Sequence, residues 1–383
     1  MTSNPQNIVS PEDQSAPFVE LFFDLVFVFS VTQVVALLHH EFNWTGVGQS
    51  LLVFWLVWWA WTQFTWTLNA ANTEHHLVQF GTLAATAVAF FMAVAVPQAF
   101  HGHGLAFAIP YVLVRAIGLA LQTLVAREDP AQRNAVRMWT VVSIGGLAAV
   151  LTGGVTGGET QYWLWALTVL LDLIAAAVGA HEEGWNLHPE HFAERHGLFV
   201  IIALGETLIV AASGLTGAAM TSDLMGVAVL AVATTCALWW TYFPKSKPTM
   251  EHAMASCLGS VRSRLARDGY SLLHFPMLCG IIAFATAIEI VAAHPSEPLA
   301  FSGRLALAAG LLLFVGGMAV AMWRATCGRL WPRAILTAVT GAAVVMVKAV
   351  PPAVTLAIAF AGVAAVAIVE HRAIEPERQS PLS

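Results

Sequence analysis

Long apolar segments recur along the whole chain, separated by short polar ones. There are twelve of them, at 18–38, 49–69, 77–96, 104–125, 135–152, 161–180, 196–214, 222–243, 270–293, 299–321, 334–350 and 352–369. A helix of about 20 residues crosses the ~30 Å hydrocarbon layer of a bilayer. A helix also bonds its own backbone groups, as a lipid environment requires. The pattern predicts an all-α fold, a polytopic integral membrane helical bundle with about twelve transmembrane helices.

The composition supports this class. Of 383 residues, 58% are hydrophobic and only 10% are charged, less than half the usual charged share of a soluble domain. The net charge of −6 comes without a basic stripe, which argues against a nucleic-acid partner. The four cysteines are scattered without a C-x-x-C pair, so we expect neither a zinc site nor a disulfide framework. The lipid bilayer is the expected partner, and no metal or cofactor is expected.

Lys and Arg gather in alternate connectors, which indicates sidedness. The set on one side is Arg127, Arg133, Arg137, Arg195, Lys245, Lys247, Arg262, Arg264, Arg267, Arg324, Arg329, Arg333, Arg372 and Arg378. The other side carries Arg304 alone. Because cytoplasmic loops carry the excess of positive charge, we expect both termini in the cytoplasm and a multi-pass protein of the inner (cytoplasmic) membrane. Residues 1–17 contain no Lys or Arg, so we expect no cleavable signal peptide.

Similar segments in the two halves indicate a duplication. The pairs are "FVE" (18–20) with "FAE" (192–194), "VWWAW" (57–61) with "LWWTY" (238–242), and "LVQFGTL" (77–83) with "LLHFPML" (272–278). They predict a 6+6 parallel repeat, as in many transporters; chance matching of common apolar residues is the alternative. The expected parts are a cytoplasmic tail (1–17), a first six-helix half (18–180), a cytoplasmic connector (181–195), a second six-helix half (196–369) and a cytoplasmic tail (370–383).

Ionisable side chains inside the apolar segments are few. Each costs about 3 kcal/mol or more at the bilayer centre and normally faces the bundle interior. The deep ones are Asp24, Arg115, Asp172 and Glu206, while Glu20 and Glu194 are expected at the cytoplasmic mouths, where solvation is easier. The i, i+4 spacing places Glu20 and Asp24 on one helix face.

The deep charges have two interpretations. In the functional one, Asp24 and Glu206 lie on neighbouring helices and are proton or cation sites. In the structural one, Arg115 pairs with one or two acids and locks the bundle. Three acids against one arginine leave a surplus of negative charge, which favours the functional interpretation.

Histidines and tryptophans have simpler explanations. The fourteen histidines are interpreted as interfacial and pH-responsive rather than metal-binding. They cluster at His39 and His40, at His75 and His76, at His101 and His103, and in the inner group His181, His188, His191 and His196. The stretch "WLVWWAWTQFTW" (55–66) is expected to pack span 49–69 and to anchor it at the inner interface. Thr62, Gln63 and Asn69 are candidates to line a path.

Four motifs resemble the bacterial low temperature requirement A (LtrA) family. They are "ELFFDLVFVFSVTQ" (20–33), "WTQFTWTLN" (61–69), "AERHGLFVIIALGETL" (193–208) and "RDGYSLLHFPMLCGIIAFA" (267–285). The resemblance covers nearly the whole chain. It implies a multispanning inner-membrane protein associated with growth in the cold, without an established biochemical activity.

The leading hypothesis is a transporter or permeation pathway for a small solute or ion, proton-linked and built around spans 18–38 and 196–214. Glu20 and Asp24 would form the inner entry and first site, Glu206 the central titrating site, and Arg115 the counter-charge. The candidate binding residues are Glu20, Asp24, Arg115, Asp172, Glu194, Glu206 and His274. The alternatives are a membrane-embedded enzyme acting on a lipid or isoprenoid, which we expect less, and a non-catalytic envelope factor. A homo-oligomer is compatible with the sequence.

Overall fold

The computed structural model describes residues 7–10, 17–179, 185–216, 221–328 and 331–378. The described residues form helices and no strand, apart from one isolated bridge between Val9 and Ala71. The chain divides into two compact units. Unit 1 comprises Met1–Phe199 and Met254–Ser271, and unit 2 comprises Val200–Ala253 and Leu272–Ser383. The predicted all-α fold is confirmed.

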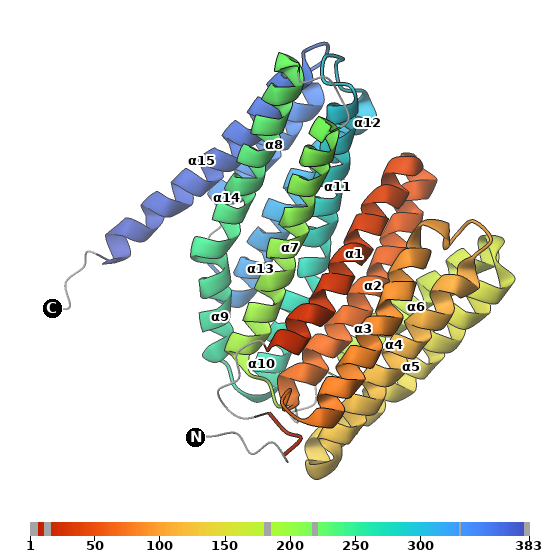
Figure 1. The fold of residues 1–383 in the computed structure, drawn as a ribbon. Coiled ribbons are helices and arrows are strands. Elements are labelled where there is room, and N and C mark those ends of the chain that lie inside the picture. The colour runs from red at the N-terminus through yellow and green to blue at the C-terminus, as the bar shows by residue number, and fades with distance from the viewer. Residues whose placement is uncertain (1–6, 11–16, 180–184, 217–220, 329–330, 379–383) are drawn as a thin grey trace. The chain divides into compact units, whose positions relative to one another are not determined.

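Unit 1 is a bundle of long helices joined by short turns (Figure 1). Its elements are α1 (Phe18–His40), α2 (Trp44–Ala70), α3 (His76–Ala95), η1 (Val96–Gln98), α4 (Gly104–Val125), η2 (Ala126–Glu128), α5 (Pro130–Thr156), α6 (Gly158–Gly179), the first part of α7 (Pro189–Thr216), α10 (Gly259–Leu265) and most of the π-helical turn η4 (Ala266–Leu272).

Helix α2 lies at the centre of unit 1. Every residue from Val53 to Ala70 is buried, and the helix packs against α1, α4 and α6. A helix that is covered on all sides can carry large and polar side chains on every face, as the tryptophans, threonines and Gln63 of α2 do. Near its end, the amide of Ser10 donates to the carbonyl of Ala70 at 2.9 Å, so residues 7–10 lie against this helix.

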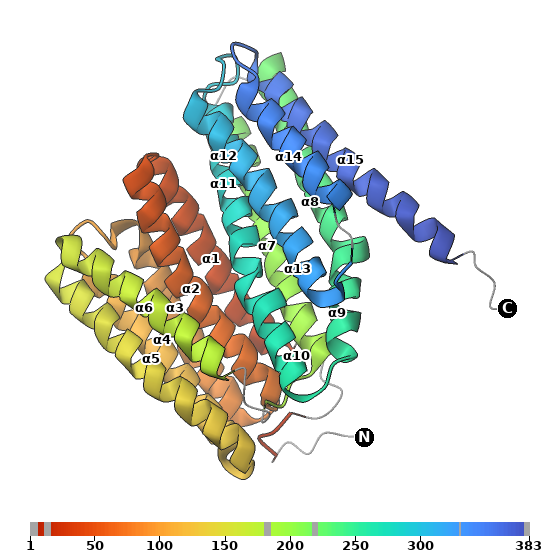
Figure 2. The same ribbon diagram turned by 180° about the vertical axis from the view of Figure 1, so that it is seen from behind.

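Unit 2 contains the remaining helices, seen from behind in Figure 2. They are the rest of α7, α8 (Ser222–Thr241), the π-helical turn η3 (Tyr242–Ser246), most of α9 (Lys247–Ala255), α11 (His274–Ala293), α12 (Phe301–Leu311), the π-helical turn η5 (Leu312–Gly316), α13 (Gly317–Thr326), α14 (Trp331–Met346) and α15 (Pro352–Arg378). Helix α15 packs along α8 and α14.

The segment 244–269, predicted as the longest connector, is largely helical instead. Helix α8 continues through η3 into α9, and the three form one continuous helical segment, Ser222–Ala255. In the same way, α10 continues through η4 into α11, which gives the segment Gly259–Ala293. π-Helical turns replace the expected loop because they absorb an extra residue without ending the helix.

Glycines lie at close helix contacts in both units. In unit 1, a Cβ on Gly154 of α5 would lie 2.8 Å from the Cβ of Ala108 on α4. In unit 2, a Cβ on Gly280 of α11 would lie 2.7 Å from the carbonyl oxygen of Gly310 on α12. Such contacts let membrane helices approach closely.

The membrane assignment agrees with the expected spans. Ten of the described helices are long and apolar enough to cross a bilayer. The other two expected spans correspond to α14, an apolar helix of 16 residues, and to α2, with 27 residues. The chain is a multi-pass membrane protein. The 6+6 repeat and the cytoplasmic position of the termini stay predictions.

Candidate functional site

Two acids of α1 meet the start of α7 inside unit 1. Arg195 has no exposed side-chain area and lies between both carboxylates. Its Nη1 donates to Glu20 Oε2, and its Nη2 donates to Asp24 Oδ1 at 2.6 Å. Trp61 of α2 donates its indole N–H to the same Asp24 oxygen at 2.7 Å. We call Glu20, Asp24 and Arg195 the carboxylate–arginine cluster.

The position of Arg195 corrects two expectations. The sequence pattern assigns it to the cytoplasmic connector 181–195, but α7 begins at Pro189 and places Arg195 inside the helix. Proline favours the first helical position, because its fixed φ suits the helix and its missing N–H is not needed there. The count of three deep acids against one arginine is therefore wrong. Glu20, expected at a solvated mouth, is also fully buried.

His191 extends the cluster by one hydrogen bond. The backbone N–H of His188 donates to Asn69 Oδ1 at 2.7 Å, which fixes the amide so that its Nδ2 faces His191 Nδ1 at 3.1 Å. An amide nitrogen only donates, so Nδ1 of His191 is an acceptor. The other ring nitrogen of His191, Nε2, lies 3.2 Å from Glu20 Oε2.

The charges of the cluster do not balance by themselves. The two carboxylates of Glu20 and Asp24 share a single guanidinium, that of Arg195, so the acids exceed the arginine by one. Glu20 Oε1 and Asp24 Oδ2 are buried and have no hydrogen-bond partner among the described residues. A buried net charge is expensive in a bilayer. One additional proton or cation at these oxygens would neutralise the cluster.

Aromatic rings enclose the cluster. The guanidinium carbon of Arg195 lies 5.6 Å from the centre of the Trp61 ring, within the range of a cation–π interaction. The ring of His196 lies 5.0 Å from that of Trp61 and 5.1 Å from that of Tyr270. His191 and His196 are both buried, so their interpretation as interfacial histidines is wrong. His181 lies outside the described residues.

A second buried ion pair lies on the other side of α2. Arg115 of α4 donates through Nη1 to Asp172 Oδ1 of α6 at 3.3 Å. The same Nη1 donates to the Tyr111 hydroxyl at 2.8 Å, and Nη2 donates to Ser143 Oγ at 3.3 Å. The Trp55 indole donates to Asp172 Oδ2 at 3.3 Å. Charge-assisted hydrogen bonds are usually about 2.7–2.9 Å long, so this pair is loosely engaged.

Four tryptophans of α2 donate hydrogen bonds inside unit 1, to the two buried ion-pair sites and to Ser271, instead of anchoring the helix at the membrane surface. Trp61 contacts the cluster and Trp55 contacts Asp172, while Trp58 and Trp66 donate to the backbone and the hydroxyl of Ser271 at 2.7 and 2.9 Å. All four are buried. The expected interfacial anchor is therefore wrong, and the expected packing role is confirmed.

The remaining candidates lie elsewhere. Glu194 is half-buried on α7. Glu206 is buried in the part of α7 that belongs to unit 2. His274 begins α11 in unit 2, and its Nε2 lies 2.8 Å from the hydroxyl of Tyr242. The structure thus joins Glu20 with Asp24 and Arg115 with Asp172. The pairing of Asp24 with Glu206 around one cavity stays a prediction.

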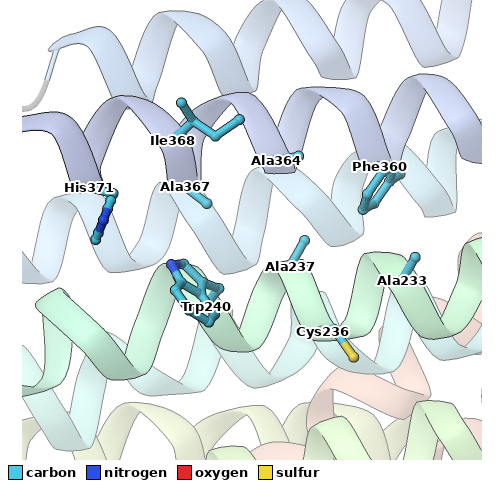
Figure 3. A pocket seen from close by; sticks show the side chains of 9 residues that line it. All are labelled: Ala233, Cys236, Ala237, Trp240, Phe360, Ala364, Ala367, Ile368 and His371. Carbon is cyan, nitrogen blue, oxygen red and sulfur yellow. The ribbon is translucent and has the colours of Figure 1, made fainter.

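A large groove of unit 2 has a different character (Figure 3). It lies along α8 and α15, encloses about 560 Å³, and is lined by Ala233, Cys236, Ala237, Trp240, Phe360, Ala364, Ala367, Ile368 and His371. These side chains are almost all apolar. The groove suits hydrocarbon better than an ion, so we place the candidate site in unit 1.

The comparisons with known proteins agree with a multi-pass helical membrane protein. The family profile described as bacterial low temperature requirement A protein (LtrA) matches residues 15–369. The uncharacterized protein RA0937 of Rhizobium meliloti (strain 1021) is 29% identical over 325 residues, which cover 82% of this chain and 77% of that protein. No solved structure matches.

Proposed function

Since this chain belongs to the bacterial low temperature requirement A (LtrA) family and is a multi-pass membrane protein, we propose that it is a proton-linked transporter or permeation pathway for a small solute or ion. Its working site is the carboxylate–arginine cluster of unit 1. In the same proposal, the protein resides in the inner membrane with both termini in the cytoplasm. The concentration of Lys and Arg on one side of the predicted topology supports this orientation.

The observation that carries the proposal is the imbalance of charge in the cluster. Glu20 and Asp24 share one guanidinium, and one oxygen of each has no partner among the described residues. A purely structural ion pair favours equal charges, because an uncompensated buried charge is costly. In this proposal, an exchangeable proton or small cation at the two remaining oxygens supplies the missing positive charge.

The surroundings of the cluster suit this exchange. Arg195 holds one oxygen of each acid in place, and His191 Nε2 lies 3.2 Å from Glu20 Oε2. The acids can therefore gain or lose a proton on the remaining oxygens without disturbing the arginine. In this proposal Glu20 and Asp24 alternate as proton acceptors, and Arg195 keeps the unprotonated state from becoming too costly.

Proteoliposomes test the proposal directly. The full chain is reconstituted with a pH-sensitive dye inside, and proton entry is followed after an imposed pH gradient. Asp24→Asn keeps size and hydrogen bonding but removes titration, so it should lower the rate about tenfold or more, equivalent to ~1.4 kcal/mol of barrier. Asp223→Asn is the matched control, because Asp223 lies in the exposed first turn of α8.

Folding is checked alongside, by gel filtration and thermal unfolding of each variant. Equal rates for wild type and Asp24→Asn, with both proteins folded, would contradict the proposed site. Release of a chemically altered lipid or isoprenoid without proton flux would instead point to a membrane-embedded enzyme. Absence of both activities would favour the envelope-factor alternative.

A further inference from the structure

Buried polar atoms without a hydrogen-bond partner follow α2 and its neighbours in unit 1. On α2 they are Trp59 Nε1, Thr62 Oγ1 and Gln63 Oε1. Arg115 and Gln122 of α4 and Trp139 of α5 also have buried polar atoms without a hydrogen-bond partner among the described residues. We call these six residues the polar seam. Among the described residues of unit 2, the buried side-chain atom without a hydrogen-bond partner is Arg333 Nε. It lies within ion-pair distance of Glu370.

Direct contacts link two pairs of these residues across the helices. The rings of Trp59 and Trp139 stack with centres 5.8 Å apart. Gln63 donates through Nε2 to the carbonyl of Arg115 at 3.2 Å, and Gln122 lies two turns further along α4, on the same helix face as Arg115. The seam therefore extends from the Arg115–Asp172 pair along the α2–α4 contact.

Buried polar groups also lie near both ends of α2. Near the start of the helix, Gln49 Oε1 and Ser50 Oγ are buried and have no partner among the described residues. Near its end, Trp66 and Ser271 line a small cavity together with Trp59 and Trp139. Polar groups thus follow α2 through most of its length.

Water is the partner that fits these atoms. Unsatisfied donors and acceptors are costly in the hydrocarbon layer, and buried waters typically bond to such groups. The cavity lined by Trp59, Trp66, Trp139 and Ser271 has a volume of about 10 Å³, at the lower end of the space that one water molecule needs. That volume is too small for an organic solute.

We propose that the polar seam is a hydrated path through unit 1 that carries protons to and from Asp172. A proton passing along the bound waters adds to a carboxylate oxygen of Asp172 and neutralises its charge. It leaves along the waters when the carboxylate bonds to Arg115 again. The long contacts of Asp172 with Arg115 and Trp55, both 3.3 Å, suit such an exchange. This inference rests on the proposed function, to which it adds Asp172 as a second proton-accepting carboxylate and a route for its protons.

The first experiment detects the water itself and does not depend on transport. X-ray radiolysis of the full chain in lipid nanodiscs generates hydroxyl radicals from bound water, and mass spectrometry locates the oxidised side chains. We expect Trp59 and Trp139 to be labelled. Trp165 is the matched control, because it is equally buried in unit 1 but donates its indole N–H to the carbonyl of Val150 at 3.1 Å. Labelling of Trp59 and Trp139 as low as that of Trp165 would overturn the hydrated path.

The second experiment tests proton movement through the seam. The double variant Thr62→Val/Gln122→Met replaces two polar side chains by apolar ones of similar shape, and should slow proton entry into proteoliposomes about tenfold. Thr86→Val is the control, since Thr86 is buried too but its hydroxyl donates to the carbonyl of Thr82 at 2.8 Å.

The two experiments separate failure of the route from failure of the function. Wild-type proton entry that the double variant leaves unchanged would overturn the route and leave the carboxylate–arginine cluster in place. Labelled Trp59 and Trp139 without any proton entry in the wild type would overturn the proposed function and, with it, the proton as the passenger.

Discussion

At the residue scale, the guanidinium of Arg195 lies between two carboxylates with no exposure of any of the three side chains. Its removal leaves two negative charges next to each other in a medium that solvates neither. Burial of an unpaired charge is among the most costly defects that a single substitution creates.

We therefore expect Arg195→Gln to lower the free energy of unfolding by roughly 3–5 kcal/mol. Thermal unfolding in detergent measures this. The triple variant Glu20→Gln/Asp24→Asn/Arg195→Gln should recover most of the loss, because no buried charge remains. Arg267→Gln is a control, since Arg267 is partly exposed and bonds to its neighbour Asp268. If Arg195→Gln unfolds like the control, the cluster is not the charged unit described above.

The sequence predicts the acids of this site but not their counter-ion. Glu20 and Asp24 stand out because carboxylates one turn apart in an apolar helix require a polar environment. Arg195 does not, because a positive charge just before an apolar span has the pattern of a cytoplasmic loop residue. Pro189 carries the missing signal: a proline at the first helical position starts α7 early enough to place Arg195 inside it. The Arg115–Asp172 pair is among the pairings that the sequence allows, but its choice depends on tertiary packing.

At the element scale, the contact between α11 and α12 depends on two glycines that face each other in unit 2. A Cβ on Gly280 would lie 2.6 Å from the backbone nitrogen of Phe314 and 2.7 Å from the carbonyl oxygen of Gly310. Backbone atoms cannot move aside as a flexible side chain can, so the helices themselves would have to separate.

We expect Gly280→Ala to destabilise unit 2 by about 1–3 kcal/mol, the usual cost of overpacking. Gly226→Ala on α8 is the matched control, because a Cβ on Gly226 would meet no atom within 4 Å. Denaturant titration followed by helix content compares the two. Equal stability of both variants would show that the α11–α12 contact tolerates a methyl group.

The helices themselves are largely predictable, and their interruptions are not. Apolar length locates the spans because the bilayer imposes it. The π-helical turns that extend α8 and α10 replace a predicted connector, since charged residues such as Lys245 and Arg267 have the pattern of loop residues. The length of its apolar segment predicts helix α2. Its central position in unit 1 depends on packing against other helices, which the sequence of α2 alone does not specify.

At the scale of the whole molecule, the distribution of Lys and Arg predicts which ends of the helices face the cytoplasm. His103 immediately precedes α4 and His252 lies on α9, and both are exposed. They belong to opposite sides in the predicted topology.

We expect a cysteine at His103 to react with an impermeant thiol reagent applied to spheroplasts, and a cysteine at His252 to react only after lysis. Both substitutions are made in a background without the four native cysteines, of which Cys236 and Cys327 are exposed. Reaction of the His252→Cys protein alone in intact spheroplasts would reverse the orientation and remove the argument for cytoplasmic termini.

The burial of α2 also has a consequence for the biosynthesis of the protein. Among the six helices α1 to α6, α2 is absent from those apolar enough to qualify as a span, and the polar side chains responsible include Thr62, Gln63 and Asn69. The ribosome delivers α2 after α1 but before α4 and α6, two of the helices that cover it. During that interval the polar side chains of α2 lack part of the cover that buries them in the complete fold. Pairing of α2 with α1 during insertion would shield some of them until α4 and α6 arrive.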